Sequence, residues 1–149
     1  MTRLASPLAG VSRLGLDTAP IIYYVEVHPR YDQVVGAVFE QLAQGPVVGV
    51  TSVVTHAEAL VLPLLRGDTQ LALAYQRLFQ RAGPLQLEPI RRAAAERAAE
   101  LRAHYKLQTP DALQLAVALR GGCQAFLTND VRLKRVAELR VLVLDELEP

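Results

Sequence analysis

Residues 13–27 of the chain read RLGLDTAPIIYYVEV, and this stretch decides the fold. It begins with a short apolar run, residues 13–16, which ends directly at Asp17. A helical pattern follows over residues 18–27, with Pro20 near its start, where a helix tolerates proline. The stretch therefore predicts a short strand, an acidic residue at its carboxyl end, and a helix that follows at once.

The same order of strand and helix repeats along the rest of the chain. Further short apolar runs occupy residues 47–51, 125–128 and 141–144, and a weaker one occupies residues 84–87. Each run is continuously apolar rather than alternating, which is typical of parallel strands buried on both faces. Helices are predicted at residues 18–27, 31–43, 53–65, 70–81, 89–105, 110–120 and 131–139.

Strands that alternate with helices indicate βαβ crossovers. The predicted fold class is therefore α/β, a three-layer α/β/α sandwich around a short, mostly parallel sheet of four to five strands. Pro63 is expected to kink or end the helix of residues 53–65. Residues 1–12 are expected to form a loose N-terminal extension to a domain of residues 13–149.

Length and composition limit the class of protein. The 149 residues fit one domain, and no apolar run reaches the roughly 18 residues of a transmembrane helix. The first residues lack the apolar segment of a signal peptide. A single cysteine, Cys123, rules out an internal disulfide and favours a cytoplasmic location. The net charge of +1 permits contact with phosphates but does not argue for it.

Four acidic residues follow or accompany the predicted strands. Asp17 follows the first strand, and Asp130 comes two residues after the run 125–128. Asp111 opens the helix of residues 110–120, and Glu58 lies in the apolar helix after the second strand. Because ligands of open parallel sheets bind outside the carboxyl ends of the strands, we expect these four side chains at one edge.

Each acid also fits a structural role. Asp17 and Asp130 suit the N-caps of helices, and Asp111 suits a first helical turn, where it complements the dipole. Glu58 fits this alternative least, because a Glu among apolar neighbours is seldom buried without a partner, although an exposed stripe of the helix would also accept it.

The four acids together point to a metal site. Two carboxylates about 4 Å apart repel by about 4 kcal/mol at an effective dielectric near 20. Several such pairs would strain a domain whose total stability is only about 5–15 kcal/mol. One or two divalent cations remove this strain, and oxygen ligands without a His or Cys cluster favour Mg²⁺ or Mn²⁺ over Zn²⁺.

Four stretches then resemble a known family in order, approximate spacing and local context. They are LDTAPIIYYVE at 16–26, THAEAL at 55–60, TPDALQLAVAL at 109–119 and FLTNDVRL at 126–133. These stretches resemble the four acidic signatures of PIN-domain proteins, and the closest similarity is to the VapC-type toxin ribonucleases of bacterial toxin–antitoxin pairs. The resemblance covers residues 14–145. One departure is Ala19, where many relatives carry a polar residue.

The resemblance implies a metal-dependent endoribonuclease that cleaves single-stranded RNA and uses Mg²⁺ or Mn²⁺. It also implies a cognate antitoxin and a homodimer. It assigns both metal binding and catalysis to four residues, Asp17, Glu58, Asp111 and Asp130. Thr128 and Asn129 would support that site. Basic residues that suit either RNA phosphates or a plain solvent-exposed surface are Arg91, Arg92, Arg132, Lys134 and Arg135.

Other functions stay open beside this interpretation. A PIN-domain nuclease that processes RNA outside a toxin pair, or a non-catalytic interaction module, would share most of these features. The apolar helices at 53–65 and 70–81 would offer such a module a face for an antitoxin helix or a second copy. The three histidines are not spaced as a zinc site. No glycine-rich phosphate loop is present, and Ala19 breaks the Asp-x-Asp pattern of haloacid-dehalogenase-type phosphatases.

Overall fold

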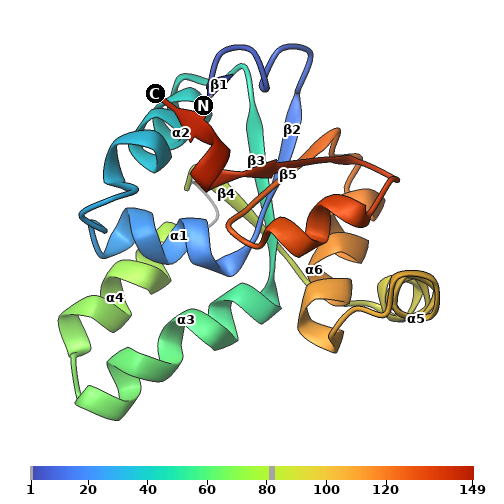
Figure 1. Ribbon diagram of the computed structural model, residues 1–149. Helices are drawn as coiled ribbons and strands as arrows, with labels where there is room; N and C mark the ends of the chain where they lie inside the picture. Colours follow the sequence, from blue (N-terminus) through green and yellow to red (C-terminus); the bar gives the residue numbers. More distant parts are fainter. Residues whose placement is uncertain (1, 81–82) are drawn as a thin grey trace.

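A parallel five-stranded sheet forms the centre of the molecule. The computed structural model describes residues 2–80 and 83–149. The strand order is β4-β3-β2-β5-β6, and every neighbouring pair is parallel (Figure 1). The bounds are β2 (Arg13–Leu16), β3 (Val48–Ser52), β4 (Leu85–Glu88), β5 (Ala125–Thr128) and β6 (Arg140–Val143). All five strands were predicted, and their ends differ from the prediction by at most one residue.

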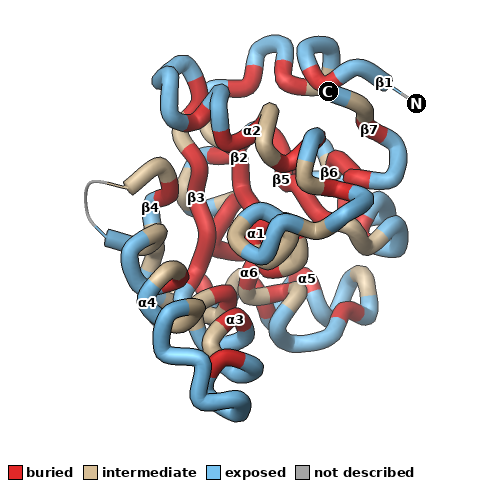
Figure 2. The backbone as a smooth tube through the Cα atoms, turned by 90° about the vertical axis from the view of Figure 1, so that its left-hand side faces the viewer, coloured by how far each residue is buried: buried red, intermediate tan, exposed pale blue. Residues whose placement is uncertain are grey.

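Helices cover both faces of the sheet, which confirms the three-layer α/β/α class. Their bounds are α1 (Thr18–Val25), α2 (Asp32–Gln44), α3 (Val53–Arg66), α4 (Thr69–Leu78), α5 (Arg92–Tyr105) and α6 (Thr109–Arg120). One core joins α1 to α4 with strand residues such as Leu14 and Leu127. The other joins α5 and α6 with residues such as Val50 and Phe126. The tube of Figure 2 shows the buried strands between these two layers.

The lack of a side chain at Gly15 sets how closely α6 approaches the sheet. A Cβ atom at Gly15 in β2 would lie 2.7 Å from the Cβ of Ala118 and 2.9 Å from the ring of Phe126. Side-chain atoms do not approach this closely, so any larger residue would push α6 outward. Gly15 therefore fixes the depth of the helix that begins beside Asp111.

The expectation of a loose N-terminal extension is wrong for residues 2–12. Strand β1 (Thr2–Arg3) pairs in parallel with β7 (Leu147–Glu148), the last strand of the chain. Leu4, Leu8 and Val11 are buried in the first core. Residue 1 lies outside the described residues. The sequence showed no long apolar pattern here because only three scattered side chains make the contact.

Three helix predictions also need correction at their ends. Pro63 lies inside α3 without ending it, and the helix stops at Gly67, whose φ of 65° is left-handed. The helix predicted for residues 131–139 is a short 3-10 helix, η1 (Val131–Arg135), and residues 136–139 connect it to β6. Helix α4 stops at Leu78, and residue 81, the predicted end, lies outside the described residues.

No helix among residues 2–80 and 83–149 has both the length and the apolar character that crossing a membrane requires.

Candidate active site

The candidate site lies where the strand order reverses. From β2 the chain moves outward to β3 and β4, and it then returns to place β5 on the other side of β2. Asp17 follows β2, and its backbone N–H donates to the Leu127 carbonyl of β5 at 2.9 Å. Thr128 is the last residue of β5. Side chains after two adjacent strands therefore meet at the switch point, the usual ligand site of such sheets.

Asp17 is only partly exposed and is held by neutral donors. The Thr18 backbone N–H donates to its Oδ1 at 2.9 Å, so Asp17 is also the N-cap of α1. The Thr128 hydroxyl donates to its Oδ2 at 2.7 Å. Burial raises the pKa of Asp17 to about 6, and the charges of Asp111 and Glu58 add to that rise, while both hydrogen bonds oppose it.

Asp111 lies in the first turn of α6 and links the other acids electrostatically. Burial raises its pKa, and the charges of Asp130 and Glu58 raise it further. Arg132 and Arg135 act in the opposite direction. Since the charges of Asp111 and Glu58 also raise the pKa of Asp17, the four carboxylates influence one another electrostatically.

Glu58 is exposed, which is one of the two positions that the sequence left open for it. It lies in α3, and its Oε1 accepts a hydrogen bond from the buried hydroxyl of Thr18 at 2.7 Å. One carboxylate oxygen is therefore fixed by the interior while the rest of the side chain faces solvent. This orientation directs Glu58 to the edge where Asp17 lies.

Asp130 is the one acid of the four that already has a cation beside it. Arg132 grips its carboxylate with two nitrogens, Nε at 2.9 Å from Oδ1 and Nη2 at 2.8 Å from Oδ2. This contact holds the pKa of Asp130 below its ordinary value. Asp130 also caps η1 through the backbone N–H of Arg132. Along the described residues, no Lys or Arg forms an ion pair with Asp17, Glu58 or Asp111.

The two predicted supporting residues face in different directions. Thr128 joins the two ends of the site, because its hydroxyl donates to Asp17 and accepts from the Asp130 backbone N–H at 3.1 Å. The Asn129 side chain accepts from the backbone N–H of Asp145 at 3.3 Å and so stabilises η2 (Leu144–Glu146). Asn129 therefore serves the fold beside the site.

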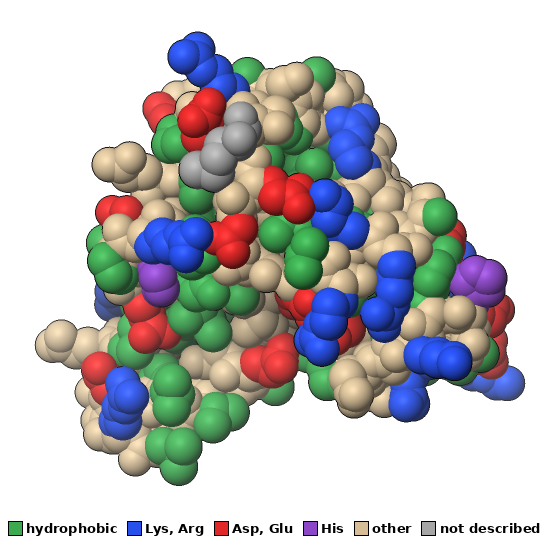
Figure 3. Space-filling view, in the orientation of Figure 1, with side chains coloured by type: hydrophobic (Ala, Val, Ile, Leu, Met, Phe, Trp, Pro, Cys, Tyr) green, Lys and Arg blue, Asp and Glu red, His purple; other side chains and the backbone are tan. Residues whose placement is uncertain are grey.

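A basic pocket adjoins Asp111 and Asp130. Arg132, Arg135 and Lys106 line it together with these two acids. In the space-filling view, acidic and basic side chains adjoin between α3 and α6 (Figure 3). Lys106 was not among the predicted contacts, because it follows the end of α5 and only the fold brings it to the acids.

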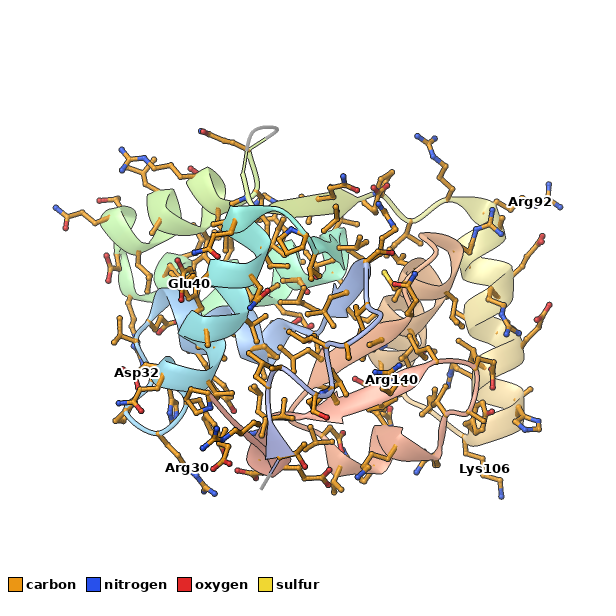
Figure 4. All side chains as sticks on the ribbon, turned by 90° about the horizontal axis from the view of Figure 1, so that it is seen from above. Arg30, Asp32, Glu40, Arg92, Lys106 and Arg140 are labelled. Carbon is orange, nitrogen blue, oxygen red and sulfur yellow. The ribbon has the colours of Figure 1, made fainter. Side chains whose placement is uncertain are left out.

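The other predicted basic residues lie elsewhere. Arg92 begins α5, and Figure 4 shows it at the opposite end of that helix from Lys106. A helix of this length spans roughly 20 Å, so Arg91 and Arg92 lie far from the pocket that Lys106 lines. Lys134 is paired with Glu146 at 2.7 Å.

Sequence reasoning missed a group of buried polar side chains beneath the acids. They are connected by hydrogen bonds and comprise Thr18, Thr51, Ser52, Thr55 and Gln114. One signal was available: Gln114 stands in the apolar stretch LQLAVAL, three residues after Asp111 and thus on the same side of the helix.

The oxygen atoms of the four acids are of the kind that bind a divalent cation. All four acids offer hard oxygen ligands, and the charge of Asp17 is buried beside two other carboxylates without a cation, so the chemistry fits Mg²⁺ or Mn²⁺. Within residues 2–80 and 83–149, no three His, Cys, Asp or Glu side chains lie close enough to hold one ion as they stand. The residues fit the ion in kind and location, and their side chains are spread more widely than a closed metal site.

Sequence comparison decides the family. The profile of the PIN domain matches residues 15–139, which include all four acids and both layers of helices. The chain belongs to the PIN domain family. Nucleases of this family generally use divalent metal ions, in keeping with the oxygen donors of this PIN domain. A search of curated proteins by sequence found no match.

Solved structures share the fold of this PIN domain. VapBC2 from Rickettsia felis, bound to a DNA fragment from its promoter, is 18% identical with a TM-score of 0.70 over 88% of this chain and 98% of that chain. VapC20 from Mycobacterium tuberculosis, a toxin that cleaves the sarcin–ricin loop, is 19% identical with a TM-score of 0.65 over 87% and 99%. A toxin–antitoxin complex from Klebsiella pneumoniae is 23% identical with a TM-score of 0.64 over 89% and 98%.

Proposed function

We propose that this protein is an endoribonuclease that requires Mg²⁺ or Mn²⁺ and acts as the toxin of a toxin–antitoxin pair. The observation that best supports this is the buried Asp17, whose pKa is raised to about 6 beside two further carboxylates at the switch point of the sheet. A protein retains such an arrangement at a cost to stability, which is typical of functional sites. The shared fold with toxins that form such pairs supports the same conclusion.

The residues of the site divide the work of phosphodiester hydrolysis. Asp17, Glu58, Asp111 and Asp130 would hold the cation. A bound divalent cation would neutralise these carboxylates, polarise the phosphate and lower the pKa of a water molecule. Thr128 keeps Asp17 aligned through its 2.7 Å hydrogen bond. Arg132, Arg135 and Lys106 line the adjoining pocket, where they would contact the RNA phosphates.

The apolar surface of α3 and α4 is the proposed contact for protein partners. The exposed large hydrophobic side chains there are Val53, Val61, Leu62, Leu64, Leu65 and Leu73. Figure 3 shows hydrophobic side chains gathered over this part of the molecule. An amphipathic antitoxin helix or the second protomer of a homodimer would bury such a surface.

A cleavage assay with a matched variant tests the proposal. Single-stranded RNA is incubated with the protein in Mg²⁺, in Mn²⁺ and in excess EDTA. Cleavage is expected with either ion and is expected to be lost with EDTA. Asp111→Asn keeps the shape of the side chain but removes its charge, so its cleavage rate should fall roughly 100-fold or more. Cleavage by this variant at the unmodified rate would contradict the proposal.

A non-catalytic module remains the second candidate, because no three of the acids form a closed ligand group in the described chain. A titration with Mn²⁺ separates the two. The nuclease should bind Mn²⁺ and gain thermal stability from it, since a ligand that binds only the folded state stabilises that state. The module should show neither effect, and it should still bind an antitoxin helix.

A further inference from the structure

The buried polar side chains beneath the acids have a direction that their hydrogen bonds determine. Their two ends are groups that can only accept: the Leu16 carbonyl and the Glu58 carboxylate. The Thr51 hydroxyl lies 2.9 Å from the Leu16 carbonyl oxygen and 2.8 Å from the Thr55 hydroxyl. Thr51 is the donor in both contacts, and because a hydroxyl has one hydrogen, the carbonyl and Thr55 share it.

Gln114 supplies the hydrogens that this chain of hydroxyls lacks. Its Nε2 lies 2.5 Å from the Thr55 hydroxyl and 3.2 Å from the Thr18 hydroxyl, so each amide hydrogen serves one of them. Its Oε1 accepts from Ser52 at 2.5 Å. Thr18 accepts from the amide and therefore has its own hydrogen free for Glu58, 2.7 Å away.

The observed orientation of the amide is the one that leaves the Thr18 hydrogen to Glu58. With Oε1 facing Thr18 at 3.2 Å, two acceptors would compete for the single hydrogen of the Thr18 hydroxyl. With Nε2 facing Thr18, the hydroxyl accepts from the amide and donates to Glu58.

The chain of bonds contacts two of the four acids and lies close in the fold to a third, Asp111. Thr18 touches two of them, Asp17 through its backbone N–H and Glu58 through its hydroxyl. Gln114 lies one helical turn after Asp111 in α6. All the side chains between them are buried: Thr18 is 8% exposed, Gln114 3% and Thr55 not at all. Solvent therefore cannot replace a lost partner.

We infer that Gln114 is a positioning residue of the nuclease, which orients the Glu58 carboxylate at the acidic edge by way of the Thr18 hydroxyl. This inference rests on the proposed function, because it concerns how the carboxylates are placed to bind the cation. Groups that orient metal ligands in this way typically change metal affinity by about 10–100-fold when they are removed.

The test measures the dissociation constant for Mn²⁺ of the full chain, by calorimetry and by the electron paramagnetic resonance of the free ion. Gln114→Met keeps the length of the side chain and removes the amide. Thr18→Val keeps the shape and removes the hydroxyl. Each change is expected to weaken Mn²⁺ binding about 10-fold, and Thr18→Ser, which keeps the hydroxyl, should stay close to the unmodified protein.

Thr51→Val is the matched control. Thr51 is as buried as Thr18 and belongs to the same hydrogen-bonded chain, but it lies at the end away from Glu58. When its hydroxyl is lost, Thr55 can donate to Thr18, 3.0 Å away, and Thr18 still donates to Glu58. We therefore expect a lower melting temperature with an unchanged affinity for Mn²⁺.

The double variant tests whether the two residues act in series. If Gln114 acts through Thr18, then Gln114→Met combined with Thr18→Val should weaken binding about as much as either change alone. Multiplied effects would overturn the inference, as would unmodified Mn²⁺ affinity in both single variants. Should Gln114→Met not fold, equal loss of affinity in Thr18→Val and Thr51→Val would overturn it. Failure of the unmodified chain to bind Mn²⁺ would instead overturn the proposed function, and this inference with it.

Discussion

The acidic edge has two halves, Asp17 with Glu58 and Asp130 with Arg132, which differ in how their negative charge is balanced. Asp17 and Glu58 are held by hydroxyl and backbone N–H donors, none of which carries a charge. Asp130 is gripped by the Arg132 guanidinium. Burial raises the pKa of Asp17, whereas the Arg132 contact lowers the pKa of Asp130. In the first half the proposed cation would supply the missing positive charge, and in the second half it would compete with Arg132.

The largest effect expected from this difference is on stability as a function of pH. The folded-state pKa of Asp17 is about 6, above the ordinary value of 3.8. The contribution of this group is therefore complete below about pH 3.8 and is lost as the pH rises through about 6. In EDTA, the free energy of unfolding in urea should fall by about 1–3 kcal/mol across this range.

Asp17→Asn provides the control for this measurement. The amide can still cap α1 but has no charge to bury, so the decline with pH should be reduced. If the free energy of unfolding of the variant fell as steeply with pH, a group other than Asp17 would be responsible for the decline. Saturating Mn²⁺ should also flatten the curve of the unmodified protein.

A smaller effect is expected from the residue that joins the halves. Thr128→Val removes the hydroxyl that donates to Asp17 and accepts from the Asp130 backbone. RNA cleavage is expected to fall about 10-fold, as it does when a group that orients a metal ligand is lost. Thr128→Ser should restore most of the rate. Equal rates in the Val and Ser variants would show that the hydroxyl does not align Asp17.

The smallest effect concerns the half that already has a cation. Arg132→Gln removes the guanidinium that competes for Asp130. The pair is exposed and contributes little, so the affinity for Mn²⁺ should rise by a factor of only about 1.5–5. RNA affinity should fall at the same time, since a phosphate contact is lost.

Arg92→Gln is the comparison for that variant. Arg92 also forms an exposed ion pair, with Glu96 at 3.1 Å, but it lies at the far end of α5. We expect neither Mn²⁺ affinity nor RNA affinity to change. Weaker Mn²⁺ binding in Arg132→Gln would show that the guanidinium helps the site rather than competing with the ion.

The sequence predicted those parts of the molecule that depend on local pattern. Continuous apolar runs predicted the five parallel strands, and the position of Asp17 directly after its strand predicted the edge of the sheet. The sequence left both a buried and an exposed position open for Glu58, because its neighbours are apolar, and the turn of α3 directs it outward. The Arg132 contact spans only two residues, yet a guanidinium so close in sequence has many other possible orientations.

Features that depend on contacts between distant segments could not be predicted. Lys106 reaches the acidic pocket only because α5 ends there. Gln114 meets Ser52 and Thr18 across 62 and 96 residues of chain, so its apolar neighbours could mark it as unusual but could not identify its partners. The same holds for Leu4 and Leu8, whose burial depends on the last residues of the chain.

The pairing of β1 with β7 has a practical consequence. Thr2 lies opposite Leu147, so fluorescent dyes attached at the two ends of the chain would transfer energy efficiently (Figure 1). Only two residues of each strand pair there, so we expect β1 and β7 to separate before the central sheet unfolds. A loss of energy transfer would report that separation. Because β1 and β7 lie side by side, a bulky fusion at one of them would crowd the other. A short peptide would suffice to connect them.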